Sequence, residues 1–125
     1  MLICDDESRT RDALKALLLA REITQDDEAS LVIEVVGEAR DGNEAIQLID
    51  THQPEVVMID ACMPGMSGVD ATRLIKKKWP SVRIVMLTMY PEQRQEALDA
   101  GVDIFLNKGC RAEKLFDAIL NEHQN

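Results

Sequence analysis

Short apolar runs alternate with amphipathic segments along this whole sequence, and this alternation restricts the fold more than any other feature. The apolar runs predict strands at residues 2–4, 31–36, 56–59, 83–87 and 104–106. The segments between them predict helices at residues 12–20, 43–51, 69–78, 91–100 and 111–122. We therefore expect an α/β fold, a doubly wound, five-stranded parallel sheet with five helices covering both faces. The polar, acidic segment 21–30 is expected either to extend the first helix or to form a long loop.

The length and charge of the chain limit its possible partners. With 125 residues we expect one domain over residues 1–125. The formal net charge of −9 argues against nucleic-acid contact by this domain and against binding to an anionic membrane. No apolar run approaches the roughly 18 residues of a membrane helix, and the acidic start is unlike a signal peptide. The scattered cysteines Cys4, Cys62 and Cys110 predict reduced thiols and a cytoplasmic location.

Polar side chains stand at the ends of four of the five predicted strands. In an open parallel sheet, ligands bind beyond the carboxyl ends of the strands, so these positions are the candidates for a site. The first run ends in Asp5 and Asp6, and the third ends in Asp60. The fourth run ends in Thr88, and Lys108 follows the fifth run one residue further on. We expect these five side chains to meet at one edge of the sheet.

The residue types at this edge point to phosphoryl transfer. Converging carboxylates repel one another beside apolar strands, so their charge needs a compensating cation. Mg²⁺ is suited to this role because it takes oxygen ligands from one or two carboxylates and keeps several waters. A lysine and a threonine hydroxyl opposite the acids would then hold an anion. Asp60 is the candidate nucleophile, since carboxylates can form aspartyl-phosphate intermediates.

Each of these residues also has an ordinary structural explanation when it is taken alone. Asp5 and Asp6 could be acids at the start of a helix, where the helix dipole favours them. Asp60 could be a turn residue before the loop. Thr88 could simply end a strand, and Lys108 could be a solvated lysine. We favour a shared site because all of them occur in the expected strand order.

The segments that carry these residues resemble a response-regulator receiver domain, the phosphoacceptor module of two-component signalling. The similar segments are LICDD, VVMIDACMPGMSG, IVMLT and FLNKG, which occur in this order over nearly the full length. The segments MPGMSG and VMLTMY are similar to the NarL/FixJ (LuxR-type) subgroup. The resemblance implies the flavodoxin-like receiver fold and a signalling role rather than that of an enzyme.

The resemblance also implies a role for each candidate residue. Asp60 would be the phosphoacceptor and a ligand of Mg²⁺. Asp6 would bind Mg²⁺ directly, Asp5 would bind it through water, and the backbone carbonyl of Cys62 would be a further ligand. These residues would form the metal side of the site.

The remaining residues would form the switch, according to the same resemblance. Thr88 would move toward the phosphoryl group, Lys108 would pair with it, and Phe105 would be the switch aromatic. The implied donor is a phosphohistidine of a histidine kinase or phosphotransfer protein. Phosphorylation would then change the surface formed by the fourth helix, the fifth strand and the fifth helix, and this change would control an output. The same surface would join two copies of the chain as a homodimer. The expected output is transcription through a DNA-binding domain that is not in this chain.

Two other functions are compatible with part of this pattern. A haloacid-dehalogenase-like phosphatase also uses Asp, Thr, Lys and Mg²⁺, but it needs a second acid where this chain has Cys62. A pseudo-receiver would bind partners without ever being phosphorylated. The complete set of candidate residues argues against it, while the stretch from Thr88 to Lys108, shorter than is usual for the subgroup, leaves it open.

Overall fold

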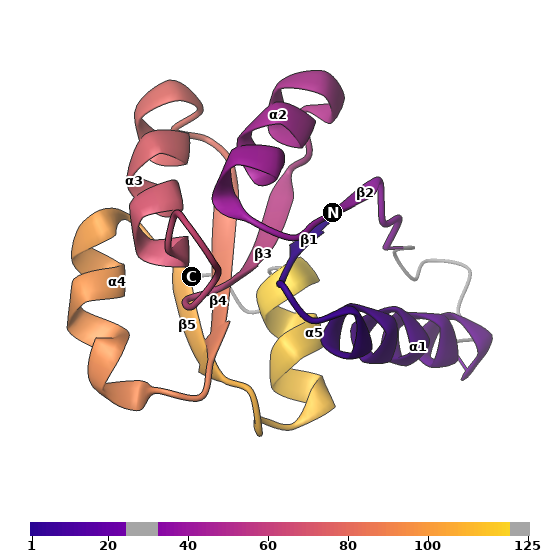
Figure 1. Ribbon diagram of the computed structural model, residues 1–125. Coiled ribbons are helices and arrows are strands. Elements are labelled where there is room, and N and C mark those ends of the chain that lie inside the picture. Colours follow the sequence, from indigo (N-terminus) through magenta and orange to yellow (C-terminus); the bar gives the residue numbers. More distant parts are fainter. Residues whose placement is uncertain (25–32, 121–125) are drawn as a thin grey trace.

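The computed structural model describes residues 1–24 and 33–120, which form one parallel sheet with helices on both faces (Figure 1). The strands are β1 (Leu2–Cys4), β2 (Gly37–Ala39), β3 (Val56–Asp60), β4 (Arg83–Thr88) and β5 (Ile104–Asn107). The helices are α1 (Ser8–Thr24), α2 (Gly42–His52), α3 (Gly68–Lys78), α4 (Arg94–Ala100) and α5 (Ala112–Leu120), and the 3₁₀ helix η1 (Pro91–Gln93) directly precedes α4. The strand order is β2-β1-β3-β4-β5 with every pair parallel, which confirms the predicted fold.

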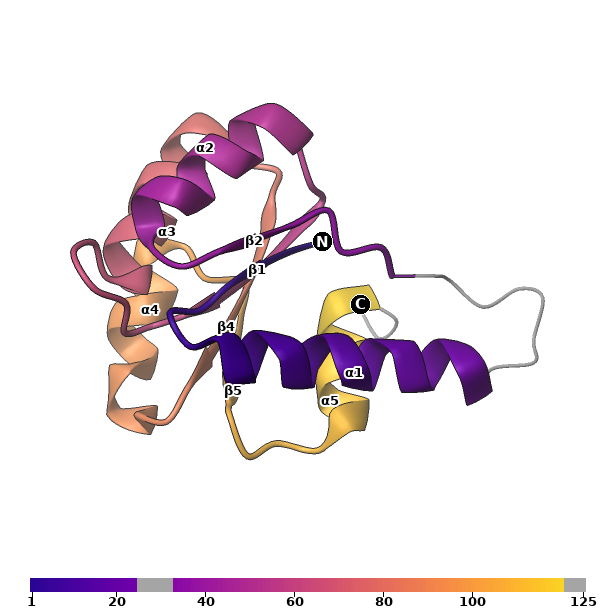
Figure 2. The same ribbon diagram turned by 45° about the vertical axis from the view of Figure 1, so that its right-hand side comes forward.

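The helices are divided between the two faces of the sheet. Helices α2, α3 and α4 cover one face, and α1 and α5 lie together on the other (Figures 1 and 2). Alternate strand residues point to opposite faces. In β3 and β4, Ile59 and Ile84 therefore pack toward the first group of helices, and Met58 and Val85 pack toward the second. Burial on both faces explains why these strands are continuously apolar.

Side-chain caps begin the two helices that flank the acidic end of the sheet. The Asp41 carboxylate accepts the Glu44 amide at 2.9 Å and begins α2. The Ser67 hydroxyl accepts the Asp70 amide at 3.1 Å and begins α3. Such caps satisfy amides that have no partner inside the helix. They fix where each helix leaves its loop.

The second strand differs from the prediction. The apolar pattern predicted a strand at 31–36, but β2 is Gly37–Ala39, and residues 31 and 32 lie outside the described residues. The register with β1 decides the position, because Leu2 pairs with Gly37 and Cys4 with Ala39. Val36 still donates its amide to the Met1 carbonyl at 2.9 Å, so the end of the apolar run lies beside the start of β1.

The helices also depart from their predicted bounds. Helix α1 continues to Thr24, so the start of segment 21–30 extends it, and residues 25–30 lie outside the described residues. The predicted helix 91–100 is divided into η1 and α4. The apolar residues of segment 69–78 predict a helix with Val69, Leu74 and Ile75 facing inward. Leu74 is instead 48% exposed, because the small residues Ala71 and Thr72 occupy the buried face of α3. In the described residues, no helix has both the length and the apolar character needed to cross a membrane.

Lys76 ties together the edge of the sheet where the strands begin. Its ammonium group donates to the Val82 carbonyl at 2.6 Å and pairs with the Asp103 carboxylate at 2.7 Å. The same carboxylate accepts the Ile84 amide at 2.8 Å. The end of α3, the start of β4 and the turn before β5 are therefore joined at this edge.

Candidate functional site

The opposite edge of the sheet, where the strands end, brings the predicted site residues together. Asp5 follows β1, Asp60 ends β3, Thr88 ends β4, and Lys108 directly follows β5. Asp5, Asp60 and Thr88 are buried, with exposed fractions of 3%, 8% and 0%. Asp6 is exposed to solvent. The site is therefore a sheet edge with a buried floor and one open acidic side.

Three carboxylates converge at this edge. Asp5, Asp6 and Asp60 each offer an oxygen, and these oxygens all lie within 4.8 Å of one another. Oxygen ligands of this kind suit a hard divalent cation such as Mg²⁺. The Cys62 amide donates to Asp60 Oδ1 at 3.4 Å, so the backbone of the following loop turns toward the acids. The metal-ligand role of the Cys62 carbonyl stays a prediction.

Lys108 is the cation that faces the buried acids. Its Nζ lies 3.1 Å from Asp5 Oδ2 and 3.4 Å from Asp60 Oδ2. Burial lowers the pKa of Lys108, but the hydrogen bond to Asp5 and the charge of Asp60 outweigh burial and raise that pKa above its usual value. The lysine is therefore charged at neutral pH and is already placed to pair with an anion on Asp60.

One lysine does not compensate the whole negative charge. Burial raises the pKa of Asp60, the neighbouring Asp5 charge raises it further, and Lys108 opposes both effects without cancelling them. A raised carboxyl pKa means that the fold disfavours the ionised form. A divalent cation beside Asp5, Asp6 and Asp60 would relieve this repulsion, and in this respect the residues present fit Mg²⁺.

Three hydrogen bonds hold the backbone and the carboxylate of Asp5. Its amide donates to the Ala39 carbonyl at 3.0 Å, and its carboxylate accepts the Glu7 amide at 2.9 Å. Its carbonyl accepts Arg11 Nη1 at 2.6 Å, while Arg11 Nε bonds Glu38 at 3.1 Å. We did not anticipate Arg11 from the sequence, because an arginine near the start of a helix carries no distinguishing signal.

Gly68 allows helix α3 to begin against the end of β3. A Cβ at this position would lie 2.0 Å from the carbonyl oxygen of Asp60, a distance that no side chain can occupy. The Gly68 amide donates to the Ala61 carbonyl at 2.8 Å, and its own carbonyl accepts the buried Thr72 hydroxyl at 2.8 Å. The backbone of Asp60 is thereby fixed by close contact with a residue that has no side chain.

The Thr88 hydroxyl is hydrogen-bonded by groups of the loop and turn that follow β4. Its oxygen accepts the Tyr90 amide at 3.0 Å, and its proton is donated to Gln93 Oε1 at 3.3 Å. Gln93 Nε2 in turn lies 3.9 Å from the Cys62 sulfur. Gln93 was also missed in the sequence, because only the folded η1 turn brings it back over β4. Phe105 is half-buried on β5 against the core beneath α2–α4, and its switch role stays a prediction.

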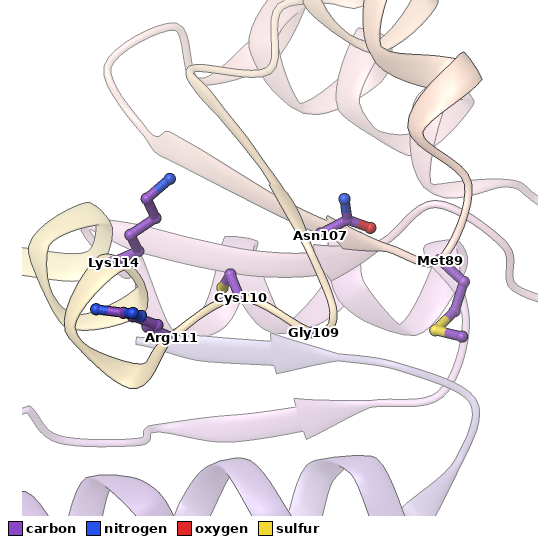
Figure 3. Close-up of a pocket in the computed structure, with 6 residues that line it drawn as sticks. All are labelled: Met89, Asn107, Gly109, Cys110, Arg111 and Lys114. Atoms are coloured by element: carbon purple, nitrogen blue, oxygen red, sulfur yellow. The ribbon is translucent and has the colours of Figure 1, made fainter.

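A cavity of about 660 Å³ opens next to Thr88 and Lys108. It is lined by Met89, Asn107, Gly109, Cys110, Arg111 and Lys114. Figure 3 shows Met89 at one end of the cavity and the cations Arg111 and Lys114 at the other. Met89 is 67% exposed, and burial raises the pKa of the Cys110 thiol. The segments that follow β4 and β5 therefore meet in an open surface beside the site.

The chain is similar to known proteins over most of its length. The family model of the response regulator receiver domain matches residues 1–120. The response regulator protein VraR of Staphylococcus saprophyticus is 35% identical over 127 residues, covering 100% of this chain and 56% of that protein. VraR of Staphylococcus aureus is 37% identical over 121 residues, covering 95% of this chain and 54% of that protein. This chain thus spans little more than half the length of these relatives. A solved two-component response regulator of the LuxR family from Aurantimonas sp. SI85-9A1 has a TM-score of 0.82 and 28% identity, covering 96% of this chain and 81% of that one.

Proposed function

The chain belongs to the response-regulator receiver domain family, and from this premise we propose that it accepts a phosphoryl group on Asp60 in a Mg²⁺-dependent reaction. It is a signalling domain of a two-component system, with LuxR-type relatives, rather than a classical enzyme. One observation carries the proposal: three carboxylates lie within 4.8 Å of one another, and the ammonium group of Lys108 is paired with two of them, Asp5 and Asp60.

The donor set supports Mg²⁺ as the resident cation. Asp5, Asp6 and Asp60, together with the Cys62 carbonyl, would hold the ion. When bound, Mg²⁺ would neutralise the acidic cluster and draw charge from the oxygens of the incoming phosphoryl group. The structure supports this assignment through the shared position of the carboxylates and the raised pKa of Asp60.

Asp60 supplies the nucleophile in the proposed reaction. One of its carboxylate oxygens attacks the phosphorus of a phosphohistidine on the partner. The new P–O bond forms as the P–N bond breaks, and the electron pair returns to the imidazole nitrogen. The product is an acyl phosphate on Asp60. Lys108 favours the ionised carboxylate beforehand, and it then pairs with a phosphoryl oxygen.

The surface beside Asp60 carries the response in this proposal. Thr88 would turn toward the phosphoryl group, and Phe105 would move with it. The face formed by α4, β5 and α5 would then change, and the cavity described above is lined by residues of β5 and α5 and by Met89, which follows Thr88. We infer that residues 1–125 form the receiver unit of a longer cytoplasmic regulator. Its donor would be a histidine kinase or phosphotransfer protein, the α4–β5–α5 face would join two copies, and the output would be transcription through a separate DNA-binding domain.

Intact mass measurement after incubation with acetyl phosphate and Mg²⁺ tests the assignment of Asp60. We expect one added phosphoryl group on the wild type, and none on Asp60→Asn or when a chelator removes the metal. If no adduct is seen, binding of beryllofluoride with Mg²⁺ separates the explanations. Binding would show a working site with a short-lived adduct. Failure to bind would refute the proposal and favour the pseudo-receiver.

A further inference from the structure

We propose that Gln93 is a positioning residue that engages the Thr88 hydroxyl proton and so opposes the switched state. This inference rests on the proposed function, because it concerns the hydroxyl that would meet the phosphoryl group. The carrying observation is that Thr88 already donates its hydroxyl proton to Gln93 Oε1 at 3.3 Å.

A threonine hydroxyl has a single proton to donate. Thr88 is fully buried, so its hydroxyl bonds to protein groups: the oxygen accepts the Tyr90 amide, and the proton goes to Gln93. A phosphoryl group on Asp60 offers only acceptor oxygens. Thr88 must therefore release Gln93 before it can donate to that group. The two acceptors compete for one proton.

The η1 turn places Gln93 where it can compete. The Gln93 amide donates to the Tyr90 carbonyl at 3.1 Å, which closes the turn that starts directly after Met89. Its side chain is half-buried and reaches back over the end of β4. The other end of the carboxamide approaches the Cys62 sulfur at 3.9 Å. Gln93 thus contacts both the end of β4 and the loop after β3.

The affinity for beryllofluoride in the presence of Mg²⁺ measures this competition. We compare the wild type with Gln93→Ala by titration calorimetry on the full chain. Loss of a hydrogen bond made only in the unmodified state should tighten analogue binding by roughly 2- to 12-fold. Gln93→Glu should weaken binding, because a carboxylate is a stronger acceptor and repels the anion. The matched control is Gln95→Ala, which removes a glutamine that bonds Asp99 on the exposed side of α4.

A second background separates positioning from a general effect on folding. In Thr88→Ala the hydroxyl is absent, so Gln93→Ala should no longer change the affinity. The inference is overturned if Gln93→Ala leaves the affinity unchanged, or if it has the same effect with and without the Thr88 hydroxyl. It is also overturned if Gln95→Ala has an effect as large. If the wild type does not bind the analogue at all, the proposed function itself fails, and this result is distinct from the others.

Discussion

Replacement of Gly68 by alanine tests whether the start of α3 fixes the acidic end of β3. The new Cβ would lie 2.0 Å from the Asp60 carbonyl oxygen, 2.9 Å from the Asp60 carbonyl carbon and 3.0 Å from the Ala61 Cα. Ordinary contacts between heavy atoms are about 3.5–4.0 Å, so the backbone must separate by more than about 1 Å. All three atoms belong to the backbone, and none can move away by a side-chain rotation.

This separation has a cost in folding and in function. Overfilling of a packed site destabilises a protein by about 1–3 kcal/mol. A Gly→Ala change offsets about 0.4–1 kcal/mol of this loss, because alanine lowers the conformational entropy of the unfolded chain. Because rigid backbone meets rigid backbone here, we expect the free energy of unfolding to fall by about 2 kcal/mol. A displacement of about 1 Å at a reacting group can lower reactivity about 100-fold. We therefore expect a loss of beryllofluoride affinity of at least about 10-fold.

Urea denaturation and calorimetry measure the two effects, and Gly109→Ala is the matched control. A Cβ at Gly109 would have no heavy atom of the described residues within 4 Å. Gly109→Ala should therefore leave the stability unchanged or raise it by up to about 1 kcal/mol. Equal stabilities of the Gly68→Ala and Gly109→Ala variants would refute the close-contact argument. Normal analogue binding by Gly68→Ala would refute its link to Asp60.

Two further predictions concern the charged groups. Lys108→Met should lower beryllofluoride affinity about 10-fold or more, because a charge-assisted hydrogen bond is lost, whereas Mg²⁺ should still bind. Calorimetric titration measures both affinities. Undiminished binding of the analogue would contradict the role of Lys108. The hydrogen bond from Lys15, with that from Arg11, lowers the pKa of Glu38, so this group stabilises the fold above its usual pKa and loses that effect as the pH falls through the lowered value. Urea unfolding should show the wild type more stable than Glu38→Gln at pH 7, with the difference decreasing as the pH falls below the usual pKa of glutamate. A difference that persists in acid would show that it does not arise from the ionised carboxylate.

The position of the candidate site was predictable from two features, the polar residue that ends each apolar run and the parallel order of the strands. A buried parallel strand is continuously apolar, so the first polar residue after it marks the edge of the sheet, as Asp5 and Asp60 do. The parallel order then brings those ends together without any knowledge of the loops. This argument predicted the sheet edge at which Thr88 and Lys108 lie in the structure, because it depends only on burial and strand direction.

The sequence-based predictions were wrong or incomplete where contacts with a distant part of the chain decide the local structure. Strand β2 includes Gly37, a poor strand residue, because pairing with Leu2 holds it there. Leu74 was expected to face inward with Val69 and Ile75, but Ala71 and Thr72 share the buried side of α3 with those two residues and leave Leu74 exposed. Gln93 was missed because its importance arises from an η1 turn, whose return over β4 has no signal in a single sequence.

The contacts of Lys76 with Val82 and Asp103 fasten one edge of the sheet. Lys76 and Asp103 hold the beginnings of β4 and β5, whereas Thr88 and Asn107 at the other ends of these strands lie at the site. A rearrangement that starts at Thr88 therefore begins at the end of β4 opposite to the end that Lys76 fastens at Val82. Met89 directly follows Thr88 and is exposed at that end of the strand, so we expect a change at Thr88 to alter the surroundings of this side chain.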